Sequence, residues 1–351
     1  MKHVFLPLSI ALVVLLVALP AQGQNQVREG TLLPGGVNPG WVEPPSWFRE
    51  TFLDIREDIE DAAAEGRNLM IYLYQDGCPY CERLIRDNFA QQDIAEKTQK
   101  YFDVVAINMW GAREVTNLDG EDVTEADFAR SLKVQYTPTL LMLDETGDVL
   151  ARINGYFPPH RFRVALEYIG EGHHTDMTFP EYLAKVGEEP ASGKLHVRDE
   201  WMTPPVDLSE VINGSDKPLL VFFEQEQCSA CDELHTDILV REESEELLKQ
   251  FNVAHVDIWS RDKLTTPAGE TMEAREWARD MNVLFTPTMV FIHPEDGEVI
   301  RTEGYFRTFH VQGVMHYVLS GAYREQPELQ RYLDDRAYEL RDQGIEVDLM
   351  D

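Results

Sequence analysis

The stretch YLYQDGCPYCERLI, Tyr72–Ile85, places two cysteines where one type of sequence pattern gives way to another. Residues 69–74 are apolar, aromatic and β-branched, which is typical of a buried strand. From Cys78 onward, through Cys81 to Phe89, apolar residues recur at helical spacing. We therefore predict that a strand ends and a helix begins at this cysteine pair.

The same arrangement occurs a second time, as FFEQEQCSACDELH at Phe222–His235. The two cysteine pairs are 150 positions apart, and downstream motifs match at an offset of 149. At that offset the sequence TPT at 137–139 faces TPT at 286–288, and GYF at 155–157 faces GYF at 304–306. Self-similarity of this length indicates an internal duplication, so we predict two copies of one domain.

Both copies show the same order of patterned segments. A lead-in helix, at 52–66 or 207–214, precedes the strand and the cysteine pair. A strand ending at Trp110 or Trp259 follows, and after it a polar loop segment and a helix. The Thr-Pro strand, a further strand and a closing helix complete each copy. This alternation of helices and strands predicts an α/β layer structure in each copy.

Segments rich in glycine, proline and polar residues mark the predicted domain boundaries. A segment rich in glycine and proline precedes the first copy, and GEEPASGK at 187–194 separates the copies as a linker. The predicted parts are a signal peptide at 1–23, a leader at 24–46, a first domain at 47–187, a linker at 188–204 and a second domain at 205–351. Each domain is expected to be a mixed sheet flanked by helices.

Length and composition narrow the class of protein. The 351 residues suffice for two domains, and a hydrophobic content of 43% can build two cores. The formal net charge of −32 supplies no cationic surface for phosphates. We therefore exclude nucleic acid as a partner. An acidic surface more often reflects solubility than function, and a salty habitat or basic partners are the alternatives.

The first residues have the pattern of an export signal. Lys2 and His3 form a short basic start, and the segment 4–19 is almost entirely apolar. The small residues Ala21 and Gly23 then offer a cleavage point after Gly23. Sixteen residues are short for a membrane span, which needs about 20. We predict a periplasmic or secreted protein with no stable membrane insertion after cleavage, in a compartment where disulfides persist.

The position of each cysteine within its helix predicts its role. Free N–H groups and a partial positive charge at a helix start favour an anion, here the thiolate of Cys78 or Cys228. Cys81 and Cys231 lie one turn deeper and are expected to act as resolving thiols. An attacked disulfide would become a mixed disulfide, which the resolving thiol then releases.

Other uses of paired cysteines fit less well. A bridge that closes four residues stabilises by only about 2 kcal/mol, against about 4.7 kcal/mol for a 100-residue loop. Zinc sites place two such pairs about 15–20 residues apart, and a c-type haem site needs histidine where Glu82 and Asp232 stand. His173 and His174 have no further ligand in pattern. We expect no metal and no cofactor.

With the cysteine pair at a strand–helix junction and the later Thr-Pro, the sequence resembles the thioredoxin superfamily twice over. The resemblance implies two tandem thioredoxin-like domains and, in each, a cis proline that faces the active-site disulfide. It implies substrate docking at Thr137, Pro138, Thr286 and Pro287. Tyr80 adds an aromatic surface beside the nucleophile on which a partner could pack. The Trp-Gly excursion, GYF and an aromatic closing helix are most similar to periplasmic thioredoxins of the sulfur-oxidation (Sox) type.

The sequence also departs from the thioredoxin pattern. The tryptophan that precedes the motif is replaced by Gly77 and Gln227. The buried carboxylate six residues before the first cysteine is replaced by Tyr72 and Phe222, so the proton acceptor for the resolving thiol is unassigned. Glu224 is a candidate in the second domain.

Two other side chains bear on that proton step. The first domain has Tyr74 at the position of Glu224, and Tyr74 cannot accept the proton. His235, one turn after Cys231, either tunes that thiol or packs as an ordinary buried side chain, and packing is the commoner role.

These features predict an exported thiol–disulfide oxidoreductase that reduces periplasmic proteins. Its expected partners are protein disulfides and an upstream dithiol donor. A disulfide oxidase or isomerase, or a protein-binding scaffold, are the alternatives. We expect the first domain to do most of the chemistry, since it has Pro-Tyr at 79–80 where the second has Ser-Ala at 229–230. Glu226, Asp232 and Glu233 add negative charge around Cys228.

Overall fold

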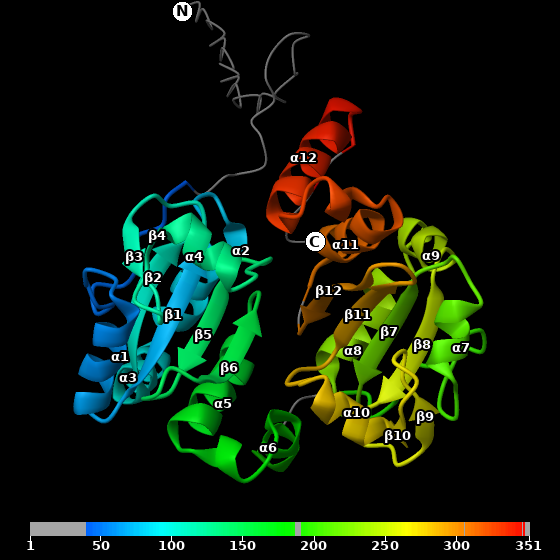
Figure 1. Ribbon diagram of the computed structural model, residues 1–351, viewed down its shortest axis with the longest axis horizontal. Helices are drawn as coiled ribbons and strands as arrows, with labels where there is room; N and C mark the ends of the chain where they lie inside the picture. Colours follow the sequence, from blue (N-terminus) through cyan, green and yellow to red (C-terminus); the bar gives the residue numbers. More distant parts are fainter. Residues whose placement is uncertain (1–39, 187–190, 305, 346, 348–351) are drawn as a thin grey trace, which may run out of the picture. The chain divides into compact units, whose positions relative to one another are not determined.

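Each of the two copies folds around a four-stranded mixed sheet in a computed structural model of the protein (Figure 1). The structure describes residues 40–186, 191–304, 306–345 and 347. The predicted signal peptide at 1–23 and most of the leader at 24–46 lie outside the described residues. The described residues form one unit that contains both domains.

The first sheet has the strand order β2-β1-β5-β6, with β1 parallel to β2 and antiparallel to β5. Its strands are β1 (Asn68–Tyr74), β2 (Phe102–Asn108), β5 (Thr139–Leu143) and β6 (Val149–Asn154), and a small hairpin is formed by β3 (Glu114–Thr116) and β4 (Asp122–Thr124). The helices are α1 (Ile55–Ala64), α2 (Pro79–Arg83), η1 (Leu84–Phe89), α3 (Gln92–Tyr101), α4 (Glu125–Ser131), α5 (Pro159–Gly170), η2 (His173–Thr175) and α6 (Phe179–Val186).

The second sheet repeats this arrangement in the order β12-β11-β7-β8. Its strands are β7 (Leu219–Glu224), β8 (Asn252–Asp257), β11 (Thr288–His293) and β12 (Gly297–Glu303), with the hairpin β9 (Lys263–Thr265) and β10 (Thr271–Glu273). The helices are α7 (Leu208–Asn213), α8 (Ser229–Glu233), η3 (Leu234–Ile238), α9 (Glu242–Leu248), α10 (Ala274–Asp280), α11 (Thr308–Leu319), η4 (Ala322–Arg324) and α12 (Leu329–Asp342).

The central strand of each sheet is buried on both faces. In β1, Met70 and Tyr72 belong to the core that contains Phe89, while Leu69 and Ile71 belong to the core on the other face. A strand covered on both sides must be apolar at every position, which explains the unbroken hydrophobic run before each cysteine pair. The matching element order and two-sided packing confirm the predicted duplication and the α/β fold class.

Two local features differ from the sequence prediction. The strands predicted to end at Trp110 and Trp259 end two residues earlier, because Asn108 and Asp257 turn the chain by accepting hydrogen bonds from the tryptophan amides, both 3.0 Å. The helix after each cysteine pair is α-helical for one turn and then continues as a π-helix, η1 or η3. Among the described residues, no helix combines the length and apolarity that a bilayer span requires.

Candidate active site

Each cysteine pair forms a disulfide at the start of a helix. Cys78 is bonded to Cys81 and Cys228 to Cys231. The first cysteine of each pair is the residue that caps the helix, and its Sγ accepts a hydrogen bond from the amide of the second, at 3.1 Å in the first domain and 3.0 Å in the second. The sulfur predicted to carry the thiolate thus lies where helix N–H groups converge.

The residue before Cys78 must be glycine for a conformational reason. Gly77 has a φ of 78°, in the left-handed region that side chains disfavour, and its amide donates to the carbonyl of Gly40 at 2.9 Å. The turn into the first cysteine therefore disfavours the tryptophan of the family pattern. It also ties the segment before the first domain to the disulfide.

The Thr-Pro loops lie beside the disulfides. The Thr137–Pro138 and Thr286–Pro287 peptide bonds are both cis, as the resemblance predicts. The carbonyl oxygen and Oγ1 of Thr137 each lie 3.4 Å from Cys78 Sγ. The carbonyl group of Thr137 is thus in contact with Cys78 Sγ, the sulfur that we expect to react with a substrate.

The sulfur atoms of both domains are buried. Cys78 is 4% exposed and Cys228 has no exposed surface. Tyr80, which we expected to present an aromatic surface, is also buried, and its ring packs edge-on against His310 with 5.0 Å between centroids. Cys78 and Cys228 therefore offer at most a small fraction of their surface to solvent in this arrangement.

The wall behind the first disulfide is aromatic and uncharged. Tyr72 occupies the position of the family carboxylate and stacks on Tyr74 at 5.4 Å between ring centroids. Burial raises the pKa of Tyr72 far above its usual value. Its hydroxyl therefore stays protonated at neutral pH and cannot take the proton of Cys81.

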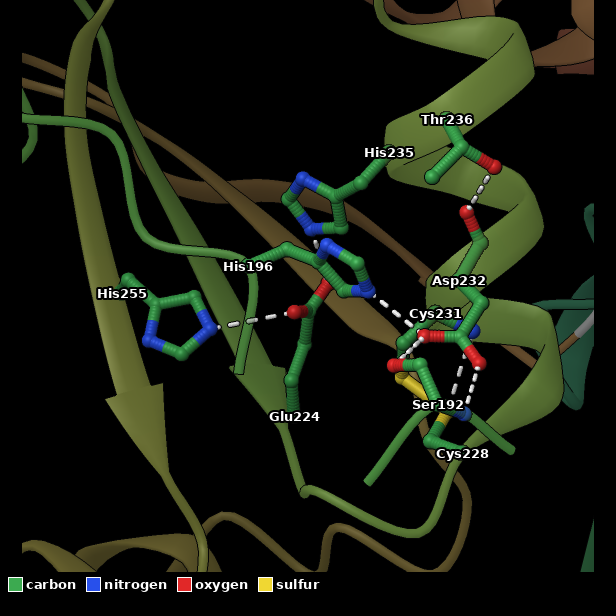
Figure 2. A network of polar contacts seen from close by, with 9 residues as sticks. All are labelled: Ser192, His196, Glu224, Cys228, Cys231, Asp232, His235, Thr236 and His255. Carbon is green, nitrogen blue, oxygen red and sulfur yellow. Dashed lines mark hydrogen bonds and ion pairs between the residues drawn. A yellow bond between two sulfur atoms is a disulfide. The ribbon is translucent and has the colours of Figure 1, made fainter. Parts of the chain in front are cut away.

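The second domain has a buried carboxylate instead (Figure 2). Glu224, at the end of β7, is fully buried and accepts hydrogen bonds from Nε2 of His235 at 2.8 Å and Nε2 of His255 at 3.0 Å. Burial alone would raise the pKa of Glu224, but the hydrogen bonds from the two imidazoles lower it below its usual value. Glu224 is thus an ionised group held four residues before Cys228.

Glu224 and His235 were predicted as candidates from the sequence, but His255 was not. His255 lies on β8, opposite Phe222 in the parallel register. A histidine inside an otherwise apolar strand pattern was the available signal, because a buried imidazole needs a polar partner. His235 does more than pack, since it donates to Glu224.

Asp232, directly after Cys231, anchors the segment that precedes the second domain. Its carboxylate accepts hydrogen bonds from the amide and Oγ of Ser192 and contacts Nε2 of His196, each at 2.6 Å (Figure 2). The His196 ring also stacks on His235, with 5.0 Å between centroids. Burial raises the pKa of Asp232, but these partners lower it below its usual value overall.

These contacts change the predicted charge balance around Cys228. Asp232 is paired with His196, and Glu233 is paired with Arg307 at 2.5 Å. In the first domain, Glu82 occupies the position of Asp232 and pairs with Arg86 at 2.6 Å. Of the three carboxylates predicted to lie around Cys228, Asp232 and Glu233 thus have polar partners, as Glu82 does in the first domain.

No metal centre accompanies these residues in the part of the chain that the structure describes: no group of three His, Cys, Asp or Glu side chains there is arranged to hold an ion. His173, considered above as a ligand, stacks on Tyr182 with 4.5 Å between ring centroids.

Comparison with known proteins assigns the same fold to both domains. A family model described as a thioredoxin-like domain matches residues 55–170 and 206–319, more than half of the chain. A search of curated proteins found no match.

Three solved structures illustrate the similarity. A thioredoxin-fold protein from Helicobacter pylori is 23% identical, with a TM-score of 0.31 over 38% of this chain and 90% of its own. A thioredoxin from Thermus thermophilus is 24% identical, with a TM-score of 0.26 over 34% and 92%. A disulphide isomerase from Xylella fastidiosa is 12% identical, with a TM-score of 0.25 over 42% and 100%.

Proposed function

Because the chain belongs to the thioredoxin-like domain family, we propose that it is an exported thiol–disulfide oxidoreductase that reduces disulfide bonds in other proteins. One observation carries this proposal. In each domain a disulfide caps the start of a helix and its first sulfur accepts an amide hydrogen bond. Such a site stabilises a thiolate once the disulfide is reduced.

The reaction is an exchange of two electrons between two disulfides. The thiolate of Cys78 attacks a substrate sulfur, forms a mixed disulfide and releases one substrate thiolate, which takes up a proton. Cys81 then loses its proton and displaces the second substrate thiolate, closing the Cys78–Cys81 disulfide. An external dithiol returns the pair to its reduced form. We propose that Thr137 and Pro138 hold the substrate beside Cys78, and Thr286 and Pro287 do so beside Cys228.

The direction of net transfer depends on the reduction potential. A reductase needs a value near that of thioredoxin, about −270 mV, whereas a strong oxidase lies near −120 mV. Among such reductases, the Trp-Gly excursion at 110–111 supports kinship with periplasmic thioredoxins of the Sox type. Export rests on the sequence of residues 1–23, and intact-mass analysis of secreted material should show a chain that starts near Gln24.

Two measurements test the proposed activity. Equilibration of each cysteine pair with glutathione gives its reduction potential, and we expect values below about −230 mV. Reduction of insulin disulfides, with a dithiol as donor, should be faster with the native protein than with the dithiol alone, and should fall to the rate of the dithiol alone when all four cysteines are serine. A protein that binds partners but turns over no disulfide would instead be a scaffold.

A further inference from the structure

Equivalent residues of the two domains make the same contacts across one interface. Tyr136 and Phe285 occupy equivalent positions, each one residue before the threonine of its Thr-Pro loop. The Tyr136 ring packs edge-on against Phe306 with 5.0 Å between centroids, and Phe285 packs against Phe157 at 4.7 Å. Phe157 and Phe306 are also equivalent. Each contact therefore occurs twice with the roles of the domains exchanged, as in an isologous dimer.

Buried polar contacts complete this interface. The Tyr136 hydroxyl donates to the carbonyl of Arg301 at 3.0 Å, and Arg161 Nη1 donates to the carbonyl of Thr286 at 3.2 Å. Asn154 and Glu303 are equivalent residues and are hydrogen-bonded to each other. A residue that meets its own counterpart lies on the local two-fold axis of the pair. The contacts therefore define one specific docking of the domains.

The two cysteine sites lie under this interface. The ring of Tyr80, between Cys78 and Cys81, packs on His310 in the first turn of α11. The equivalent residue in α5 is Arg161, which reaches the Thr-Pro loop of the second domain. Each domain thus extends the start of its closing helix into the disulfide site of the other.

Little space remains directly beside Tyr80 and the two Thr-Pro loops. Cavities of about 10 Å³ lie beside Tyr80 and Thr137 in one site and beside Phe285 and Thr286 in the other. A volume of this size holds about one water molecule. A larger opening of about 650 Å³ reaches Ser229, but none of the four cysteines lines it.

Thiol–disulfide exchange requires direct contact between the attacking and attacked sulfur atoms. With Cys78 at 4% exposure and Cys228 at zero, a folded protein substrate cannot make that contact. We propose that each domain covers the cysteine pair of the other, and that exchange with protein substrates occurs only after the domains separate at this interface. This inference rests on the proposed function, because it assumes that the reaction is thiol–disulfide exchange. It adds how the cysteine pairs become accessible to a protein substrate.

The rim of the interface suits such a separation. Arg130 and its equivalent, Arg279, each form an ion pair with the other domain, with Glu328 at 3.2 Å and with Glu181 at 3.3 Å. Both arginine side chains are more than half exposed, and exposed ion pairs contribute little stability. The rim pairs thus add little to the stability of the docked arrangement and leave separation possible.

A cross-link across the rim tests the inference. All four native cysteines are in disulfides, so thiols introduced by Arg130→Cys and Glu328→Cys are the only free ones in the oxidised protein. They would be joined by a short bismaleimide, which survives the later reduction of the native pairs. The control is the same variant with each new thiol capped singly by N-ethylmaleimide. Glu181→Cys with Arg279→Cys provides the matched lock on the equivalent rim.

The readout is the rate at which the reduced native thiols react with a polyethylene-glycol maleimide. We expect the locked protein to react at least about tenfold more slowly than the capped control, as for a group exposed only by opening. Equal rates, with unchanged thermal transitions, would overturn the inference. Insulin reduction should fall in parallel. If the capped control reduces no insulin, the proposed function fails, while the alkylation rates still decide whether the domains cover each other's thiols.

Discussion

Asn154 and Glu303, which occupy equivalent positions in the two domains, are joined by a hydrogen bond of 2.7 Å from Asn154 Nδ2 to Glu303 Oε2. Duplication has thus left an amide on one side of the local axis and a carboxyl on the other. Burial raises the pKa of Glu303, and Arg301, Asn154 and Arg152 offset this only in part, while Glu298 adds to the rise.

Glu303 should therefore make the stability of the protein depend on pH. Because its pKa is higher in the folded than in the unfolded protein, its stabilising contribution is present at low pH and is lost as pH rises through the folded value. Glu303→Gln should raise the thermal transition at pH 7 more than at pH 4.5. Glu295→Gln, an exposed substitution of the same kind, serves as control. A larger gain at pH 4.5 would contradict the assignment.

The sequence predicted the parts of the site that depend on local pattern. The strand–helix junction at Cys78 and Cys228, and the Thr-Pro loops, follow from spacing and from repetition of the same motifs. Burial of Tyr80 did not follow, because its contact with His310 joins residues far apart in the chain. Periodicity reports which face of an element is buried and not what buries it.

The linker shows the same limit. Ser192 and His196 lie in a stretch whose glycine and proline content indicates a connection between domains. Their contacts with Asp232 depend on the position of α8, which no local pattern contains. The short strands are a related case, since the Asn108 and Asp257 side chains end β2 and β8 by hydrogen bonds that the apolar pattern does not encode.

The roles of the two cysteines in the first domain can be separated by trapping. Cys81→Ser leaves the capping thiol of Cys78 able to attack but removes the thiol that resolves the intermediate. This variant should accumulate a mixed disulfide with insulin, visible by non-reducing electrophoresis and mass spectrometry. Cys78→Ser is the matched control and should accumulate none. Trapping by Cys78→Ser instead would reverse the assignment.

The two imidazoles that contact Glu224 should contribute a large part of the free energy of unfolding of the second domain. His255→Leu would remove one of the two imidazoles that contact the buried carboxylate, and loss of a hydrogen bond to a charged group costs about 1.5–3 kcal/mol. Adding Glu224→Leu to that variant removes the buried carboxylate itself, so the combined loss should be smaller than the sum of the two single losses, although His235 then lacks its acceptor. Denaturant unfolding of the oxidised proteins measures both. Additive losses would show that the two residues do not interact.

Asp232 should hold the segment that contains Ser192 in place. Asp232→Ala removes the acceptor of three polar contacts, and a charge-assisted hydrogen bond contributes about 1.5–3 kcal/mol. The Ser192 amide should then exchange its hydrogen faster, by roughly tenfold or more. Glu82→Ala, at the equivalent position of the first domain, should leave that amide unchanged. Unaltered exchange in Asp232→Ala would show that the segment is held by other contacts.

The two disulfides should contribute unequally to turnover, with the first pair dominant. Cys78 retains some exposed surface and is followed by Pro79 in the first helical turn, where proline adds rigidity without losing a needed amide. Cys228 has no exposed surface, and the helix that it caps is tied to Ser192 through Asp232.

Changing each pair separately to serine tests this order. The Cys78→Ser, Cys81→Ser protein should lose at least about nine-tenths of insulin reduction, because a pair that must open further is exposed less often. The equivalent change in the second domain should cost less than half. The thermal transitions of both double variants are measured in parallel, so that a loss of activity caused by unfolding can be distinguished from the loss of a cysteine pair. Equal losses, or a larger loss from the second pair, would show that the second domain carries the chemistry or passes electrons to the first.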